Sequence, residues 1–117
     1  MSGALRVHIV EERGRLAVVA AVGDLDMSTA GDFHNAATGL IAEHPDLVVD
    51  LAGVEFCDSS GFNALLRVQR RVHEAGGRFA LAAAPEPVAR LLTLAGGGDD
   101  LFALYRGWEQ GAEALSR

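Results

Sequence analysis

The sequence predicts an α/β fold: one mostly parallel sheet of about five strands, with an antiparallel first hairpin, packed against about four helices. Its 117 residues, half of them apolar and 22% charged, suit one globular domain (residues 1–117, core about 5–115). Two strand-like runs come first. Short β-branched runs then alternate with segments whose apolar residues recur at helical spacing, which favours a parallel sheet with helical crossovers.

The first two strands are predicted to form a hairpin. Residues 5–10 (Leu-Arg-Val-His-Ile-Val) alternate apolar and polar side chains, the pattern of a half-buried strand. Residues 15–22 are apolar nearly throughout, as in a central strand that is buried on both faces. The polar segment between them, residues 11–14, ends in glycine and is predicted as the turn.

The first helix is predicted over residues 28–44. Ser28 or Thr29 is well placed to cap its N-terminus. Asp32 lies in the early turns, where the helix dipole favours a carboxylate. Pro45 is incompatible with a continuing helix and is expected to end it.

The remaining elements are predicted from the same signals: β-branched or apolar runs for strands, helical apolar spacing for helices, and glycine pairs for helix ends. They are a strand over 46–51, a loop over 52–57, a helix from Ser59 or Ser60 to Gly76-Gly77, a strand over 78–83, a helix over 87–95, a glycine break at 96–98, a strand over 101–105 and a helix over 108–115. Strands that alternate with helices along the chain indicate right-handed crossover connections. The periodicity of the sequence does not fix the order of the strands within the sheet.

Composition limits the classes of binding partner and the cellular compartments that the protein suits. The net charge of −6 disfavours direct nucleic acid binding, which depends on a basic face. The longest near-continuous apolar stretch, residues 16–22, is far shorter than the ~20 residues needed to cross a bilayer, and the N-terminal residues lack a signal-peptide pattern. A single cysteine, Cys57, excludes an internal disulfide framework and suits a reducing compartment. We therefore expect a cytoplasmic protein without membrane insertion.

Two predicted strand–helix junctions carry most of the reactive side chains. Gly23-Asp24-Leu25-Asp26 follows the second strand, and Asp58-Ser59-Ser60-Gly61 precedes the second helix. In an open α/β sheet such junctions gather at the carboxyl ends of parallel strands, so we expect both segments at one edge. Taken alone, the first segment suits a turn and the second a helix cap, so each also has a purely structural interpretation.

The two segments in this order resemble the STAS-domain family of anti-sigma factor antagonists. The family's Gly-acidic-Leu-Asp turn stands at 23–26, and its strand-loop-Asp-Ser-Ser/Thr-Gly segment stands at 48–61. The end of the following helix and the later apolar runs are similar too, so the resemblance spans roughly residues 5–115. Asn63 departs from the pattern, because many members carry a second glycine there.

The resemblance implies a phosphorylation switch. In the family, an anti-sigma factor that is also a serine kinase phosphorylates the serine directly after the motif aspartate, which is Ser59 here. The unphosphorylated protein would bind that anti-sigma factor and release a sigma factor, and a serine phosphatase would reset it. Ser60 would contribute to the cap and the contact surface, while Asp24, Asp26 and Asp58 would shape the docking site. The resemblance implies no catalytic activity and no cofactor.

The helix that follows the motif adds a companion surface. Its members recur at three- and four-residue spacing on the side away from the apolar stripe of that helix: Ser60, Asn63, Arg67, Arg70 and Glu74. We predict that Asn63 and Arg67 contact the partner. An ordinary solvated helix face is the alternative interpretation.

Other functions compete with this prediction. Within the family, the same edge would serve a non-switching docking subunit of a lipid-transport or stress-signalling complex, or a ligand-sensing module. A small serine hydrolase is a remote alternative, because residues 57–61 differ by one residue from a Gly-x-Ser-x-Gly elbow. A serine hydrolase of this kind needs a histidine later in the chain. The only one is His73, about four turns along the same helix and ~20 Å from its start, so it cannot reach the serine. The four histidines are scattered, so no metal site is predicted. The oligomeric state stays open.

Overall fold

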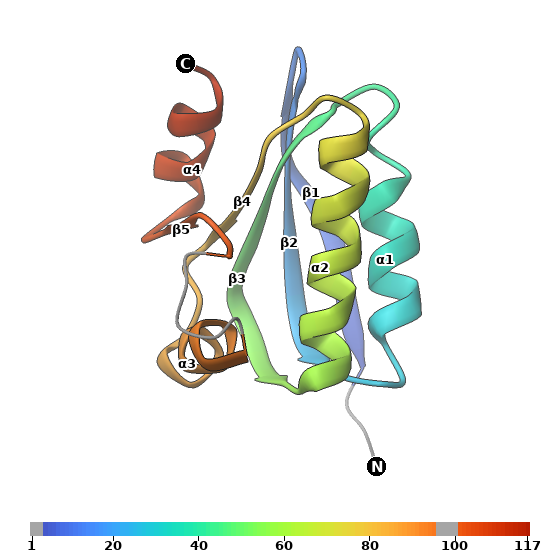
Figure 1. Ribbon diagram of the computed structural model, residues 1–117, viewed down its shortest axis with the longest axis vertical. Coiled ribbons are helices and arrows are strands. Elements are labelled where there is room, and N and C mark those ends of the chain that lie inside the picture. The colour runs from blue at the N-terminus through green and yellow to red at the C-terminus, as the bar shows by residue number, and fades with distance from the viewer. Residues whose placement is uncertain (1–3, 96–100) are drawn as a thin grey trace.

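The computed structural model describes residues 4–95 and 101–117, and within them five strands form one sheet in the order β1-β2-β3-β4-β5 (Figure 1). The strands are β1 (Leu5–Arg13), β2 (Leu16–Leu25), β3 (Asp46–Cys57), β4 (Phe79–Ala82) and β5 (Leu104–Tyr105). The helices are α1 (Ala30–Thr38), α2 (Ser59–Glu74), α3 (Glu86–Ala95) and α4 (Trp108–Leu115). β1 is antiparallel to β2, and the other neighbouring pairs are parallel. The predicted fold class is confirmed.

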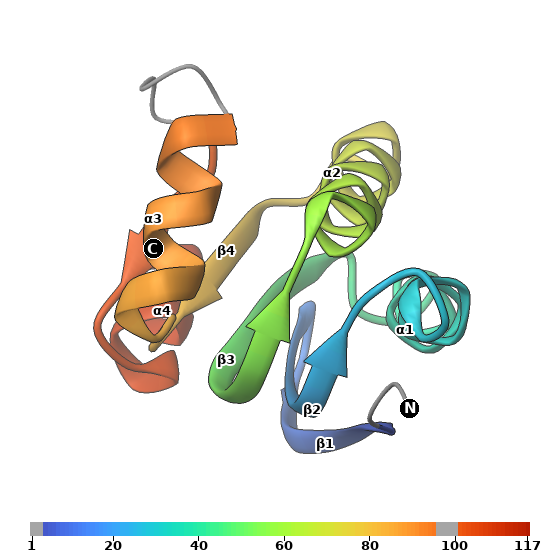
Figure 2. The same ribbon diagram turned by 90° about the horizontal axis from the view of Figure 1, so that it is seen from below.

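Helices cover both faces of the sheet (Figure 2). Residues of α1, α2 and α3 share one core with Val19 and Val49 of the central strands. Residues of α4 share a smaller core with Val18 and Val48 on the opposite face. Successive side chains of a strand point to opposite faces, so the continuous apolar runs of β2 and β3 supply both cores. The prediction of a central strand buried on both faces is confirmed.

The pairing of β2 with β3 extends further than the sequence predicts. The loop predicted over 52–57 is wrong, because β3 continues to Cys57 and pairs there with Leu25 at the end of β2. Residues 52–57 lack a regular apolar pattern. Pairing with β2 nevertheless satisfies their backbone groups, and Val54 is buried beneath the helices.

The first helix is shorter than predicted. α1 ends at Thr38, and the chain then tightens into turns, with Leu40 and Ile41 donating to carbonyls three residues back at 3.2 Å. Gly39 is a weak helix former at this point. Asp32 does lie in the first turn, as predicted. Thr29 is the N-cap residue by position, but its side chain does not cap the helix.

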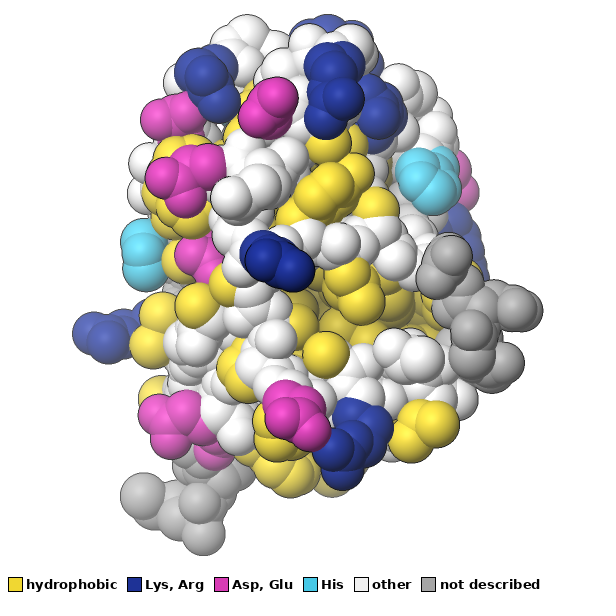
Figure 3. Space-filling model, turned by 90° about the vertical axis from the view of Figure 1, so that its left-hand side faces the viewer, with side chains coloured by type: hydrophobic (Ala, Val, Ile, Leu, Met, Phe, Trp, Pro, Cys, Tyr) yellow, Lys and Arg dark blue, Asp and Glu magenta, His cyan; other side chains and the backbone are white. Residues whose placement is uncertain are grey.

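The last strand is also shorter than predicted. β4 is only four residues long, and it pairs with just Leu104 and Tyr105 of the run predicted over 101–105. Phe102 turns inward instead, 5% exposed and in edge-to-face contact with Phe62 of α2. Beyond this short edge strand, hydrophobic side chains gather at the surface (Figure 3). The glycine break predicted at 96–98 lies outside the described residues.

β1 forms the other edge of the sheet and is irregular. The strand runs to Arg13, so the turn predicted over 11–14 is wrong in extent: only the end of that segment, at Gly14 (φ +53°), leaves the strand. Its register with β2 shifts between Ile9 and Glu11, which marks a β-bulge. The extra residue, Val10, is 36% exposed.

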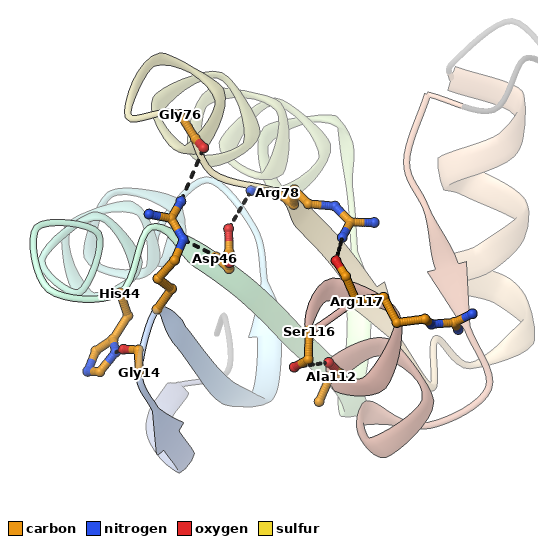
Figure 4. A network of polar contacts seen from close by, with 9 residues as sticks. Gly14, His44, Asp46, Gly76, Arg78, Ala112, Ser116 and Arg117 are labelled. Carbon is orange, nitrogen blue, oxygen red and sulfur yellow. Dashed lines mark hydrogen bonds and ion pairs between the residues drawn. The ribbon is translucent and has the colours of Figure 1, made fainter.

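A polar network joins the chain segments at the amino-terminal ends of β2 and β3 (Figure 4). Asp46 is 7% exposed, and its Oδ1 accepts from the Arg78 backbone N–H at 2.9 Å. Its Oδ2 lies 3.4 Å from Nε of Arg15, whose Nη2 donates to the Gly76 carbonyl at 3.2 Å. One buried carboxylate therefore ties the start of β2 to the turn between α2 and β4.

His44 connects the β1–β2 hairpin to the segment before β3. One ring nitrogen, Nδ1, lies 2.7 Å from the Gly14 carbonyl oxygen, and Nε2 lies 2.8 Å from Oε2 of Glu12. Both partners only accept hydrogen bonds, so the ring satisfies both when it is protonated. The Gly14 contact, and secondarily Glu12 and the charge of Glu43, raise the pKa of His44 above its ordinary value.

This geometry predicts that His44 stabilises the fold in a pH-dependent way. Because the folded pKa is raised, the contribution is fully present below the unfolded pKa of about 6.5 and is lost as pH rises through the folded pKa. We expect His44→Gln to lower the free energy of unfolding more at about pH 5.5 than at about pH 8.5 in urea titrations. The exposed His73→Gln change is the control. An equal loss at both pH values would contradict the assignment.

Candidate functional site

The carboxyl ends of β2 and β3 lie side by side at one edge of the sheet, at the bottom of Figure 1. Leu25 and Cys57 are paired in register, and the Asp58 backbone N–H donates to the Leu25 carbonyl at 3.4 Å. The structure thus brings together the two segments singled out in the sequence, at 23–26 and 58–61, as parallel topology dictates. We call residues 24–29 and 56–61 the aspartate rim.

Asp58 caps α2, and the serine after it stays exposed. The Oδ1 atom of Asp58 accepts from the backbone N–H groups of Ser60 at 2.9 Å and Gly61 at 3.1 Å. These bonds satisfy two of the donors that a helix N-terminus leaves unpaired. The capping interpretation is therefore correct for Asp58. The cap makes no use of the hydroxyl of Ser59, which is the first residue of α2 and is exposed.

Gly61 allows α2 to begin directly against the sheet. A Cβ atom at this position would overlap the Leu25 carbonyl oxygen and would lie 2.8 Å from Sγ of Cys57. Real Cβ atoms are not found at such separations, so a larger residue would push the helix start away from the strands. The glycine of the Asp-Ser-Ser-Gly segment thus fixes where Ser59 sits relative to β2.

The other half of the rim is a hydrogen-bonded turn between β2 and α1. Asp26 is 8% exposed, and its Oδ1 accepts from the Ser28 backbone N–H at 2.9 Å and from the Ser28 hydroxyl at 2.7 Å. The Ser28 hydroxyl is the main cause that holds the pKa of Asp26 below its ordinary range, with backbone N–H groups of Ser28 and Thr29 adding to it. Asp26 is therefore an ionised carboxylate that shapes the turn from inside.

Thr29 and Asp24 complete this turn. The Thr29 hydroxyl donates to the Asp24 carbonyl at 2.7 Å and accepts from the Asp26 backbone N–H at 3.0 Å. Asp24 itself lies in β2, where it pairs with Phe56 of β3, and its side chain is half-buried. Gly23-Asp24-Leu25 is therefore strand rather than the turn that the sequence suggests.

A groove of about 560 Å³ runs from the rim along α2 and beside the start of α1. It contains three residues that the sequence predicts as partner contacts, Ser60, Asn63 and Arg67. Ser60 is half-buried, whereas Asn63 and Arg67 are exposed. The groove therefore begins one residue after Ser59, and any molecule seated in it would have Ser59 at its margin.

Sequence reasoning missed several surface residues of this region. Met27, which is 82% exposed, and Leu66 line the groove. They lie there beside Arg70, which the sequence does place on this helix face. Phe56, which is 51% exposed, stands on the rim two residues before Asp58. One signal was present in the sequence: an apolar Met27 inside a polar turn has no core to enter. Exposed apolar side chains beside polar ones are typical of protein-binding surfaces.

Two chemistries are not supported at the rim. Burial, with a smaller contribution from the Asp58 charge, raises the pKa of the Cys57 thiol to about 11, so the thiol is protonated and unreactive at neutral pH. Among residues 4–95 and 101–117, no three side chains of His, Cys, Asp or Glu gather in a way that could hold a metal ion.

Membrane insertion is a separate question. In residues 4–95 and 101–117, no helix has the length and apolar character needed to cross a membrane.

Comparison with known proteins identifies the family. A family model described as "Mlab, STAS domain" matches residues 8–104, which is most of the chain and includes the whole rim and groove. The chain belongs to the STAS-domain family. The resemblance inferred from the Asp-Ser-Ser-Gly segment is thereby confirmed.

Solved structures of STAS proteins superpose closely on this chain. An anti-sigma factor antagonist from Mycobacterium paratuberculosis is 27% identical, with a TM-score of 0.82 over 97% of this chain and 96% of that chain. A serine-to-glutamate variant of RsbS from Moorella thermoacetica is 26% identical, with a TM-score of 0.78 over 95% of each chain. Phosphorylated SpoIIAA of Bacillus is 19% identical and shares the fold, with a TM-score of 0.71 over 96% of this chain and 99% of that chain. The structural neighbours of this chain include anti-sigma factor antagonists.

The close approach at Gly61 predicts that Gly61→Ala destabilises the protein. The added methyl group must displace α2 from the end of β2, which costs about 1–3 kcal/mol of unfolding free energy. Gly31→Ala in α1 is the matched control, because nothing lies within 4 Å of a Cβ at that position. Removing a helical glycine there should raise stability by about 0.5–1 kcal/mol. Denaturant titration of both variants measures the difference, and a Gly61→Ala protein as stable as the parent would refute the packing argument.

Proposed function

We propose that this STAS protein is a cytoplasmic anti-sigma factor antagonist, without catalytic activity of its own, that is regulated by phosphorylation of Ser59. In the unmodified form it binds an anti-sigma factor with serine kinase activity through the aspartate rim and the groove, and a sigma factor is released. That kinase then phosphorylates Ser59 and ends the complex, and a serine phosphatase restores the binding form. The observation that carries the proposal is an exposed Ser59 at the first position of α2, next to the capping Asp58.

The fold can accept a phosphate at Ser59 without rearrangement. Phosphorylation adds about −1.5 to −2 charges and three acceptor oxygens. Ser59 is exposed, and the cap of α2 is made by Asp58, so no described hydrogen bond of the cap has to break. The positive end of the α2 dipole favours an anion there by ~0.3–2 kcal/mol. We therefore expect the modification to act on partner binding rather than on folding.

Electrostatics explain how one phosphate would dissociate the partner. The rim already carries the carboxylates of Asp24, Asp26 and Asp58. A partner surface that fits a neutral hydroxyl among them would meet added negative charge. At an effective dielectric of ~20 and a separation of ~7 Å, each added unit charge makes a like-charged contact less favourable by ~2 kcal/mol. Since ~1.4 kcal/mol is tenfold in affinity, the complex would weaken by about one to three orders of magnitude.

The named relatives support this proposal. The M. paratuberculosis protein is an anti-sigma factor antagonist that aligns over nearly its whole length. SpoIIAA is known in a phosphorylated form, and RsbS has been examined with a glutamate in place of a serine. These properties belong to those proteins. For this chain, the equivalent proposal rests on the position and exposure of Ser59.

The groove indicates what the partner surface should contain. Arg67 and Arg70 line it beside the exposed Met27 and the apolar Leu66. A partner that fits would place carboxylates against the two guanidinium groups and an apolar side chain against Met27. The same partner would present neutral or basic groups to the aspartate rim. Such a two-part surface would distinguish the cognate anti-sigma factor from others.

The proposal predicts that Ser59 is the phosphorylated residue. Incubation with ATP and the candidate kinase should add one phosphate to the protein, and tandem mass spectrometry should place it on Ser59. The Ser59→Ala protein should gain none. Ser60→Ala is the matched comparison, because it removes the neighbouring hydroxyl, which makes no contact in the Asp58 cap. Ser60 lines the groove, so the rate of modification can fall, but the phosphate should still be added to Ser59. A phosphate on Ser60, or on neither serine, would contradict the proposal.

The proposal also predicts that added negative charge at the rim or in the groove weakens partner binding. By titration calorimetry, Ser59→Asp should weaken binding of the anti-sigma factor at least about tenfold, because it places a charge among the rim carboxylates. Arg67→Glu should also weaken it about tenfold or more by reversing a charge in the groove. Arg106→Glu, at an exposed position between β5 and α4, is the charge-matched control. Tight binding that is indifferent to Ser59→Asp would instead favour a permanent docking subunit.

A further inference from the structure

The groove beside the aspartate rim is bounded by two helices of different character. α1 and α2 lie side by side on one face of the sheet (Figure 2). α2 supplies one wall with side chains from three successive turns: Ser60, Asn63, Leu66, Arg67 and Arg70. At a helical rise of ~1.5 Å per residue, this wall is ~15 Å long. The opposite wall consists of Ala30 and Gly31 of α1, preceded by Met27. Apart from Met27, the α1 side therefore has almost no side-chain volume.

Gly31 leaves space beside α2 that a larger residue would take. It is exposed, and nothing lies within 4 Å of a Cβ atom placed at this position. Glycine is a poorer helix former than alanine, and Gly31 lies inside α1. Neither packing within the protein nor helix stability therefore accounts for glycine here. What Gly31 does provide is an open approach to the backbone of α1 from the groove.

Arg67 and Arg70 give the groove positive charge that the protein does not neutralise. They are three residues apart and so lie on the same side of α2. Among the described residues, 4–95 and 101–117, no carboxylate lies within 4 Å of either guanidinium group. Met27, which is 82% exposed, and the half-buried Leu66 add apolar surface beside them. A partner segment that carries carboxylates next to apolar side chains would complement both features.

A helix suits this groove better than an extended segment does. An extended peptide gains much of its affinity from main-chain hydrogen bonds to the edge of a sheet. The described residues that line the groove come from α1, α2 and the turn before α1, and not from the edge strands β1 and β5. A helix satisfies its own backbone groups. Carboxylates at three- or four-residue spacing on such a helix would face Arg67 and Arg70 together.

We propose that the groove receives an acidic amphipathic helix of the anti-sigma factor, and that Gly31 is the residue that admits it. This rests on the proposed function, since it names the part of the partner that lies beside Ser59. The partner helix would pack as a third helix against α1 and α2, with apolar residues on Met27 and Leu66 and carboxylates on the two arginines. Because Ser59 stands at the margin of the groove, a phosphate there would also repel this acidic helix.

Substitution of Gly31 tests the proposal by titration calorimetry with the candidate anti-sigma factor. Gly31→Trp fills the groove and should weaken binding at least about tenfold, because the partner helix can no longer approach α1. Gly31→Ala adds one methyl group and should keep the affinity within about threefold of the parent. Ala36→Trp is the matched control, because it places the same side chain at an exposed position of α1 outside the groove. Circular dichroism checks that each variant is folded.

Two further measurements test the acidity and the helical structure of the occupant. Arg70→Glu should weaken binding at least about tenfold, whereas Arg71→Glu, at an exposed position of α2 outside the groove, should not. Hydrogen exchange of the anti-sigma factor should show one segment that becomes protected in the complex. A synthetic peptide of that segment should be acidic, and its helical circular dichroism should increase when this protein is added.

Several outcomes would overturn the proposal: unchanged affinity of Gly31→Trp, an equal loss in Ala36→Trp, or a protected segment that is basic or binds without becoming helical. A dimer that Gly31→Trp converts to a monomer in light scattering would also overturn it, because a second copy would then occupy the groove. The switch fails separately, through binding that is indifferent to Ser59→Asp. No binding by the unmodified protein would refute the proposed function and this inference together.

Discussion

The parallel pairing of β2 with β3 is the constraint on which the rest of the molecule depends. It aligns Leu25 with Cys57 at one end and Leu16 with Asp46 at the other. The first alignment brings the turn before α1 against the cap of α2 and so assembles the aspartate rim. The second sets Asp46 among the arginines at the far end. Because the side chains between these ends are buried on both faces, a slip of the register would exchange the two cores and dismantle both ends together.

Much of this arrangement could be predicted from sequence patterns. The apolar run of β2 and the β-branched start of β3 identified central strands, and the Asp-Ser-Ser-Gly segment identified the junction that carries Ser59. The continuation of β3 to Cys57 could not be found in this way, because it depends on pairing with β2 rather than on a local pattern. The length of helix α1 was overestimated for the complementary reason. The apolar residues of 39–44 keep helical spacing, but the backbone there closes into tighter turns.

The candidate site was predictable in its residues but only partly in its geometry. Nothing in the sequence distinguishes the roles of the aspartates, since each suits a turn or a cap. The structure separates them: Asp26 is bound within its own turn, Asp58 caps a helix, and Asp24 belongs to a strand. Met27 and Phe56 were missed, because exposure of a single apolar residue depends on how the surrounding chain folds.

The bulge in β1 has a consequence for how these molecules coexist at high concentration. An edge strand exposes a row of backbone donors and acceptors to which another chain can add. In β1 the register shift at Ile9 and Glu11 interrupts the regular spacing of that row halfway along the strand. A neighbouring chain could match only one half of the edge at a time, so continuous growth of the sheet from molecule to molecule is disfavoured. The irregular border of β1 thus acts as a barrier against fibre formation.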